Sequence, residues 1–219
     1  MQQITLVVFC KRPLPGQGKQ RIAATMGTEA AYEVARALLC CAMEDAEIWP
    51  GPVVLSPVSE SDRSWAENLL HREHLVIPQV EGNLGQKLND VDQQLRRQGH
   101  ERLLFIGTDA PEHSPELYHE LHQLFQRQDV VLTPAADGGV TTMGSCGAWP
   151  NLAELPWSTE RLGDALADSC RDVGFQVAFS SACYDVDNRE DLHRLLSSLV
   201  KDTRPARQQL LKTIQRLLV

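Results

Sequence analysis

The sequence has no apolar run of the length that a membrane-spanning helix needs, which is about 20 residues. Its first residues carry no charged side chain ahead of the apolar segment 4–9, so the pattern of a secretory signal peptide is missing. None of the six cysteines forms a C-x-x-C pair, which argues against a zinc site and is typical of reduced thiols. From these absences we expect a cytoplasmic protein that does not bind a membrane.

An excess of basic residues is absent as well. The chain holds 21 Lys and Arg against 29 Asp and Glu, for a net charge of −8. Proteins that bind nucleic acid normally show a basic surface, so we expect no nucleic-acid partner. Internal repeats and low-complexity linkers are also missing. We expect one domain over residues 1–200, followed over 201–219 by an amphipathic helix that packs on the domain or forms a contact in a homodimer.

What the chain does contain is a regular alternation of short apolar segments with helical patterns. The segments rich in Val, Leu, Ile and Phe that predict strands are 4–9, 53–55, 75–77, 102–106, 130–133, 140–147 and 175–179. The segments with helical spacing of apolar residues are 28–46, 61–71, 84–97, 115–125, 159–173, 189–199 and 210–218. This alternation predicts an α/β fold of three layers, α/β/α, with a mostly parallel sheet of about seven strands.

The first predicted strand opens into a loop that is rich in cations. Over 11–21 the loop holds two prolines, two glycines and four basic residues: Lys11, Arg12, Lys19 and Arg21. Glycines let backbone N–H groups approach an anion, and Lys and Arg neutralise its charge, so the loop is a candidate phosphate site. A surface turn with solvated charges remains the alternative.

The Gly18-Lys19 pair in this loop does not belong to a P-loop. Walker A requires Gly five residues before the Gly-Lys pair, where this chain has Pro13. It also requires Ser or Thr after the lysine, where this chain has Gln20. We therefore exclude a P-loop nucleoside triphosphatase.

Carboxylates follow several predicted strands, at the sheet edge where ligands of such folds bind. Asp109 comes directly after the strand 102–106, where its oxygens can hold a hard divalent cation or cap the turn. Asp187 can supply a second ligand from another strand end, although Asp187 or Asn188 can also cap the following helix. Asp137 opens an Asp-Gly-Gly turn, and a contact with ligand there rests on its position alone.

An ordered set of motifs resembles a known family. The motifs are K-x-P-x-P-G-x-x-K-x-R over 11–21, G-x-L-G over 82–85, G-T-D-A-P over 107–111, P-A-x-D-G-G over 134–139, W-S-T over 157–159 and D-V-D-x-x-x-D-L over 185–192. In this order they resemble the glycosyltransferase A-like family called DUF2064. That family is related to 2-phospholactate guanylyltransferase and to molybdenum-cofactor nucleotidyltransferases.

The resemblance implies a nucleotide-diphospho-sugar transferase (GT-A) fold and a site at the carboxyl edge of its sheet. Asp109 and Lys19 would be the catalytic residues, and the metal ligands would be Asp109 and Asp187. The residues expected to bind the nucleotide or its phosphates are Lys11, Pro15, Gly16, Lys19, Arg21, Gly82, Asn83, Gly85, Asp137, Gly138 and Gly139. The implied cofactor is Mg²⁺ or Mn²⁺.

The function that we expect is metal-dependent transfer from a nucleotide-sugar or a nucleoside triphosphate to a small-molecule acceptor. Glycosyl and nucleotidyl transfer both remain open. The chain departs from the family pattern at Gln20, Asn83, Val140 and the pair Thr141-Thr142. These departures keep a second hypothesis open, which is a catalytically impaired protein of the same fold that binds a nucleotide or a partner.

Overall fold

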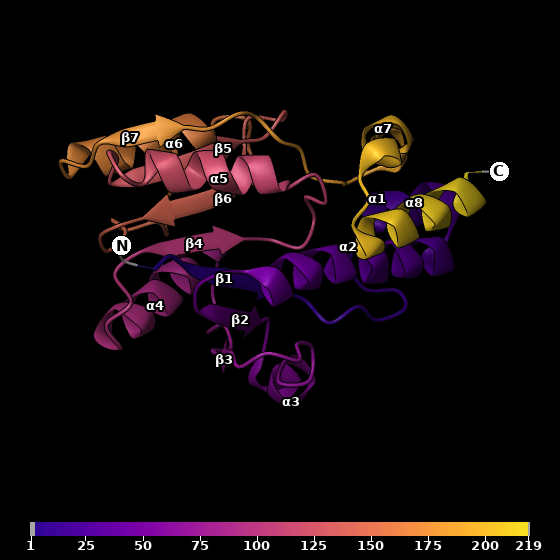
Figure 1. The fold of residues 1–219 in the computed structure, drawn as a ribbon, viewed down its shortest axis with the longest axis horizontal. Coiled ribbons are helices and arrows are strands. Elements are labelled where there is room, and N and C mark those ends of the chain that lie inside the picture. The colour runs from indigo at the N-terminus through magenta and orange to yellow at the C-terminus, as the bar shows by residue number, and fades with distance from the viewer. Residues whose placement is uncertain (1–2, 219) are drawn as a thin grey trace.

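The computed structural model describes residues 3–218 and contains one seven-stranded sheet (Figure 1). Its strands are β1 (Thr5–Cys10), β2 (Val53–Pro57), β3 (Leu75–Val76), β4 (Leu103–Ile106), β5 (Val130–Pro134), β6 (Val140–Ser145) and β7 (Val177–Phe179). Their order is β3-β2-β1-β4-β6-β5-β7. Strand β6 runs antiparallel to β4 and β5, and the other pairs are parallel. The predicted mostly parallel sheet of seven strands is confirmed.

Helices cover both faces of the sheet, which confirms the predicted three layers. The α-helices are α1 (Gln20–Met26), α2 (Thr28–Ile48), α3 (Arg63–Ala66), α4 (Leu84–Arg97), α5 (Pro115–Leu124), α6 (Leu162–Asp172), α7 (Arg189–Ser198) and α8 (Pro205–Leu217). Side chains alternate along β1, so that Leu6 and Val8 pack with α2, α3 and α5 while Val7 packs with α4 and α6. Among residues 3–218, no helix is both long and apolar enough to span a membrane.

Two helical segments differ most from the prediction. Helix α1 lies where we expected the loop to continue, so Gln20 and Arg21 belong to its first turn. The helical spacing of apolar residues is a weak signal for α1, because Ile22 is its only buried residue. The helix predicted over 61–71 is much shorter, since α3 ends at Ala66. Beyond it, the Arg72 guanidinium donates hydrogen bonds to backbone carbonyls at and just after the end of α2, which are contacts that helical spacing does not reveal.

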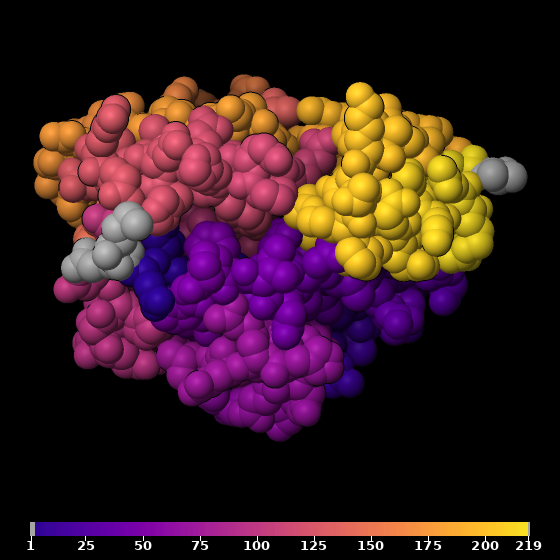
Figure 2. All heavy atoms as spheres, viewed as in Figure 1, coloured from indigo at the N-terminus to yellow at the C-terminus, as the bar shows by residue number. Residues whose placement is uncertain are grey.

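A third apolar cluster lies beyond the carboxyl ends of the strands. It joins α1, α7 and α8 to the first half of α2 through residues such as Val34, Leu38, Leu195 and Leu210. Figure 1 shows these helices gathered at one end of the molecule, and Figure 2 shows the yellow C-terminal helices seated on the purple N-terminal ones. Helix α2 is 21 residues long and packs both against the sheet and in this third cluster. The boundary at residue 200 and the homodimer contact remain predictions.

A buried ion network fastens α8 to α2 and to the segment after β4. The Arg207 side chain is fully buried, and its Nη2 donates to Asp45 Oδ2 at 2.6 Å and its Nη1 to Glu44 Oε2 at 3.0 Å. Its Nε donates to the Pro111 carbonyl at 3.1 Å. The segment that carries Asp109 is therefore anchored from the C-terminal helix.

Candidate functional site

The loop between β1 and α1 is shaped by residues with positive φ. Gly16 and Gly18 have φ of 78° and 75°, and Lys19 itself is left-handed with φ 47° and ψ 42°. A non-glycine residue in this region costs on the order of 1 kcal/mol or more, and functional sites often contain such strain. The Gln20 side-chain amide donates to the carbonyls of Gly16 and Gly18, which closes the loop. As a result, Lys19 is held at the N-cap position of α1.

The Lys19 ammonium lies among oxygens from two other segments. Its Nζ is 2.9 Å from Asp109 Oδ1 and 3.8 Å from Asp187 Oδ1, and it donates to the Val186 carbonyl at 2.6 Å. The side chain of Lys19 is only 8% exposed, whereas those of Asp109 and Asp187 are 48% and 43% exposed. The Arg21 guanidinium, which is largely exposed, lies 3.2 Å from Asp187 Oδ2. The structure thus brings together two of the predicted cations and both predicted metal ligands.

Backbone contacts hold the two carboxylates at this edge. Asp109 follows β4, and its carbonyl accepts a hydrogen bond from Val186 N at 2.9 Å. Asn188, and not Asp187, caps α7: its side chain accepts from Asp191 N, while Asp191 Oδ2 accepts from the backbone N–H groups of residues 187 and 188. The Asp187 carboxylate is therefore left to face the Lys19 and Arg21 cations.

Further negative charge surrounds this pair. Burial raises the pKa of Asp185, and the negative charges of Asp187, Asp137 and Asp109 raise it further. Carboxylates that follow β4, β5 and β7 thus lie within electrostatic reach of one another. The carboxylates near Lys19 favour a bound cation, and the basic residues of the opening loop favour an anion beside it.

A cavity of about 330 Å³ lies at the carboxyl edge of the sheet, beside Lys19, Asp109 and Asp187. The cavity is lined by Lys11, Arg12, Pro13, Gln17, Gly18, Lys19, Gln20, Arg21, Ala35, Thr108, Asp109 and Asp187. Five of the predicted site residues line it, and so do Arg12, Gln20 and Thr108, which are not among the residues expected to bind the nucleotide or the metal. Their signals were available, since Arg12 belongs to the cation-rich loop and Thr108 precedes Asp109.

The family and the fold follow from comparison with known proteins. The model of a family described as uncharacterised proteins conserved in bacteria (DUF2064) matches residues 41–159, more than half of the chain. The chain belongs to this family. No curated protein matches the sequence.

Solved structures show which fold this DUF2064 chain shares. A protein of Desulfovibrio desulfuricans G20, provisionally named a nucleotide-diphospho-sugar transferase, is 20% identical with a TM-score of 0.88, over 100% of this chain and 97% of that one. The bifunctional IspDF of Campylobacter jejuni is 10% identical with a TM-score of 0.57, over 88% of this chain and 54% of that one. A CMP:2-keto-3-deoxy-manno-octonic acid synthetase in complex with CTP is 11% identical with a TM-score of 0.52, over 89% and 97%. The chain has the fold of nucleotide-diphospho-sugar transferases.

Other predicted site residues of this DUF2064 chain lie outside the lining of the cavity and have structural contacts. Asn83 caps α4 in a reciprocal pair with Gln86, and its Nδ2 donates to the Ala153 carbonyl at 2.9 Å. A Cβ at Gly85 would collide with the Leu152 carbonyl, so close packing requires glycine there. The nucleotide contact predicted for Gly82, Asn83 and Gly85 remains a prediction.

The Asp137-Gly138-Gly139 turn also has a structural explanation. Asp137 Oδ1 accepts a hydrogen bond from Gly139 N at 3.0 Å. Gly138 has φ 85°, and a Cβ there would collide with the backbone of Glu160. Pro15 and Gly16 lie in the opening loop but not in the cavity lining. The ligand contacts predicted for these five residues likewise remain predictions.

The departures from the DUF2064 pattern have identifiable contacts. Gln20 closes the cationic loop, and Asn83 caps a helix, as described above. Val140 packs against the apolar cluster under α4 and α6. Thr142 Oγ1 lies 2.5 Å from Thr133 Oγ1 in a buried hydroxyl pair. These four replacements are thus accommodated by the fold.

The residues around Lys19 also fit a divalent cation. In the described part of the chain, no three His, Cys, Asp or Glu side chains form a ready-made metal centre. Mg²⁺ and Mn²⁺ need only one or two carboxylates when phosphate oxygens and waters supply the other ligands. Asp109 and Asp187 meet this requirement, and the Lys19 ammonium between them shows that a cation is accommodated there.

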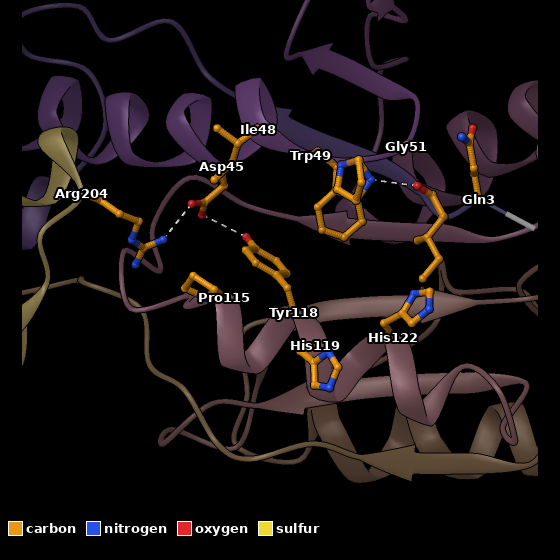
Figure 3. Close-up of a pocket in the computed structure, with 12 residues that line it drawn as sticks. Gln3, Asp45, Ile48, Trp49, Gly51, Pro115, Tyr118, His119, His122 and Arg204 are labelled. Atoms are coloured by element: carbon orange, nitrogen blue, oxygen red, sulfur yellow. Dashed lines mark hydrogen bonds and ion pairs between the residues drawn. The ribbon is translucent and has the colours of Figure 1, made fainter. Parts of the chain in front are cut away.

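A second cavity of about 480 Å³ lies between α2 and α5 (Figure 3). Asp45 lies between Arg204 and Tyr118, accepting hydrogen bonds from Arg204 Nη1 at 2.9 Å and Tyr118 Oη at 3.0 Å. Trp49 lines the same cavity, and its Nε1 donates to the Ile4 carbonyl. The charges of Asp45 and Arg204 neutralise each other, so this cavity lacks the cationic lining of the cavity around Lys19.

Proposed function

We propose that this protein is a metal-dependent transferase that uses a nucleoside triphosphate or a nucleotide-sugar and a small-molecule acceptor. The observation that carries the proposal is the meeting of Lys19 with Asp109 and Asp187 in one cavity, with Lys11 and Arg21 beside them. Carboxylates beside cations suit a metal–phosphate group, which carries both kinds of charge.

In this proposal the acidic residues would bind the metal and the basic residues would bind the phosphates. Asp109 and Asp187 would hold Mg²⁺ or Mn²⁺, which when bound neutralises the phosphate oxygens of the leaving group. Lys19 and Arg21 would bind the same phosphates, and preorganised cations stabilise charge most where it develops during reaction. Lys11 would bind a further phosphate group of the same nucleotide. These assignments are part of the proposal.

Nucleotidyl and glycosyl transfer both release a phosphate-bearing leaving group and use the same elements. Four cations on the opening loop suit a triphosphate, which favours nucleotidyl transfer. One solved structure with this fold holds CTP, which agrees with a nucleotide as ligand. The family likeness to glycosyltransferases favours glycosyl transfer.

Binding and product analysis test the proposal together. Isothermal titration with the four ribonucleoside triphosphates and their common sugar conjugates, with Mn²⁺ present, should give at least one saturable ligand. Turnover with an acceptor library then separates the reactions, because nucleotidyl transfer releases pyrophosphate and glycosyl transfer a nucleoside mono- or diphosphate. Folded protein that binds none of these ligands would refute the proposal, and binding without turnover would favour the impaired nucleotide-binding protein.

A further inference from the structure

The Lys19 ammonium occupies the position that the proposed function gives to the divalent cation. Three oxygens surround it: Asp109 Oδ1 at 2.9 Å, Asp187 Oδ1 at 3.8 Å and the Val186 carbonyl at 2.6 Å. Carboxylate and carbonyl oxygens are also the donors that hard divalent cations take in proteins. Because the Lys19 side chain is nearly buried, its charge is directed at these oxygens and not at solvent.

Two cations do not fit between these carboxylates at once. An ammonium and a divalent cation a few ångströms apart repel each other strongly where solvent is partly excluded. Without either cation, Asp109 would lose its ion-pair partner, and Asp187 would keep only the largely exposed Arg21. One cation between the two carboxylates is therefore favoured, and a second is disfavoured.

We propose that Lys19 and the divalent cation occupy this position in alternation, so that the cation binds tightly only when a nucleotide draws Lys19 away. The inference rests on the proposed function, since the phosphates are the alternative partner of Lys19. In the free protein the ammonium pairs with Asp109 and Asp187, and a metal ion must displace it. In the complex the ammonium turns to the phosphates and leaves the carboxylates to the metal.

The geometry makes this exchange easy. Lysine carries its charge on a four-carbon stem with several rotatable bonds, so the ammonium can move while the backbone stays in place. The α1 N-cap fixes the Lys19 backbone, and Gln20 fixes the loop before it. Phosphates bound in the same cavity would lie within reach of this stem. The movement would couple nucleotide binding to metal binding in both directions.

Metal binding without any nucleotide tests the first half of the proposal. We expect Lys19→Met to bind Mn²⁺ about tenfold more tightly than the wild type in calorimetric titration, because the competing ammonium is gone. Lys19→Arg keeps the charge and should bind Mn²⁺ as weakly as the wild type. Lys11→Met is the matched control, since it removes a lysine from the same cavity that does not contact the carboxylates, and should change Mn²⁺ affinity less than about twofold. Equal Mn²⁺ affinity of Lys19→Met and the wild type overturns the proposal.

The effect of nucleotide on Mn²⁺ affinity tests the second half of the proposal, and the wild type is the main sample. We expect the triphosphate that binds best to tighten Mn²⁺ binding about tenfold or more in the wild type, and by a smaller factor in Lys19→Met. Chelation of Mn²⁺ by free nucleotide is the same for both proteins and cancels in the comparison. The alternation is overturned if nucleotide tightens Mn²⁺ binding by the same factor in both proteins. It is also overturned if the wild type binds Mn²⁺ tightly without any nucleotide. A failure of all nucleotides to bind would instead refute the proposed function, and the nucleotide-free titration would still decide whether Lys19 competes with metal.

Discussion

Asp109 is the residue on which the proposed chemistry depends most. Its carboxylate faces Lys19 from the end of β4 and is half exposed to the cavity. We expect Asp109→Asn to lower metal-dependent turnover by about 100-fold or more, because the amide removes the charge that holds the cation while keeping the shape. Steady-state rates at saturating Mn²⁺ measure the effect. Asp168→Asn, at an exposed ion pair on α6, is the control and should retain the wild-type rate.

His113 is a residue whose effect is on stability and depends on pH. Burial lowers its pKa to about 3, helped by the positive charges of Arg207 and Arg204. Its Nε2 is buried without a hydrogen-bond partner among the described residues. The folded protein therefore keeps His113 neutral, whereas the unfolded chain takes up a proton near pH 6.5.

The sign of this effect follows from proton linkage. The folded-state pKa is lowered, so the stability contribution is complete above pH 6.5 and is lost as pH falls towards 3. Between pH 7 and pH 5 the wild type should lose up to about 2 kcal/mol more unfolding free energy than His113→Gln. Urea unfolding at both pH values measures the difference. The same loss in both proteins would mean that His113 does not carry the dependence.

At this scale, the sequence predicted which charged residues would meet at one edge of the sheet, while the roles of these residues remain predictions. Lys19, Asp109 and Asp187 follow predicted strands, and the fold brings such strand ends to one edge whatever lies between them. Asn83 and Asp137 also follow strand ends, but local hydrogen bonds to their own turns use their side chains. Sequence spacing does not distinguish these two outcomes.

At the scale of elements, α8 is held in place by the buried Arg207, and the sequence alone does not reveal which residue this cation contacts. Arg207 and Asp45 are 162 residues apart in the chain, yet their side chains form a buried hydrogen bond. The apolar positions Leu210 and Ile214 predict that a helix forms, but they do not say that it packs against α2. Helical spacing of apolar residues did not predict α1, because this helix has a single buried residue.

Replacing Arg207 tests how much this network contributes. We expect Arg207→Met to lower the free energy of unfolding by about 2–3 kcal/mol, since Asp45 would keep its pair with Arg204 but lose a buried, charged hydrogen bond. Arg216→Met, on the same helix, removes an exposed pair with Glu33 and should have little effect. Urea denaturation of the two variants measures the contrast. Equal losses would indicate that helix propensity, and not the buried network, explains the change.

At the scale of the whole molecule, the sequence predicted the layers but not the order of the strands. Alternating helices and strands indicate a mostly parallel sheet, yet the antiparallel β6 between β4 and β5 depends on contacts between distant segments. The same contacts bring residues 11–21, 107–111 and 185–188 together. Arg21 and Asp187, for example, meet across 166 positions of the chain.

Because the site joins segments from both ends of the chain, a bound ligand should stabilise the whole fold. At a concentration 100 times its Kd, a nucleotide with Mn²⁺ adds about 2.7 kcal/mol to the free energy of unfolding. For a chain of this size that corresponds to a rise in Tm of roughly 5–11 °C. Asp109→Asn should show a much smaller rise at the same concentrations. Hydrogen exchange should slow most in the three joined segments, and a rise in Tm with protection confined to α2 and α5 would locate binding in the other cavity instead.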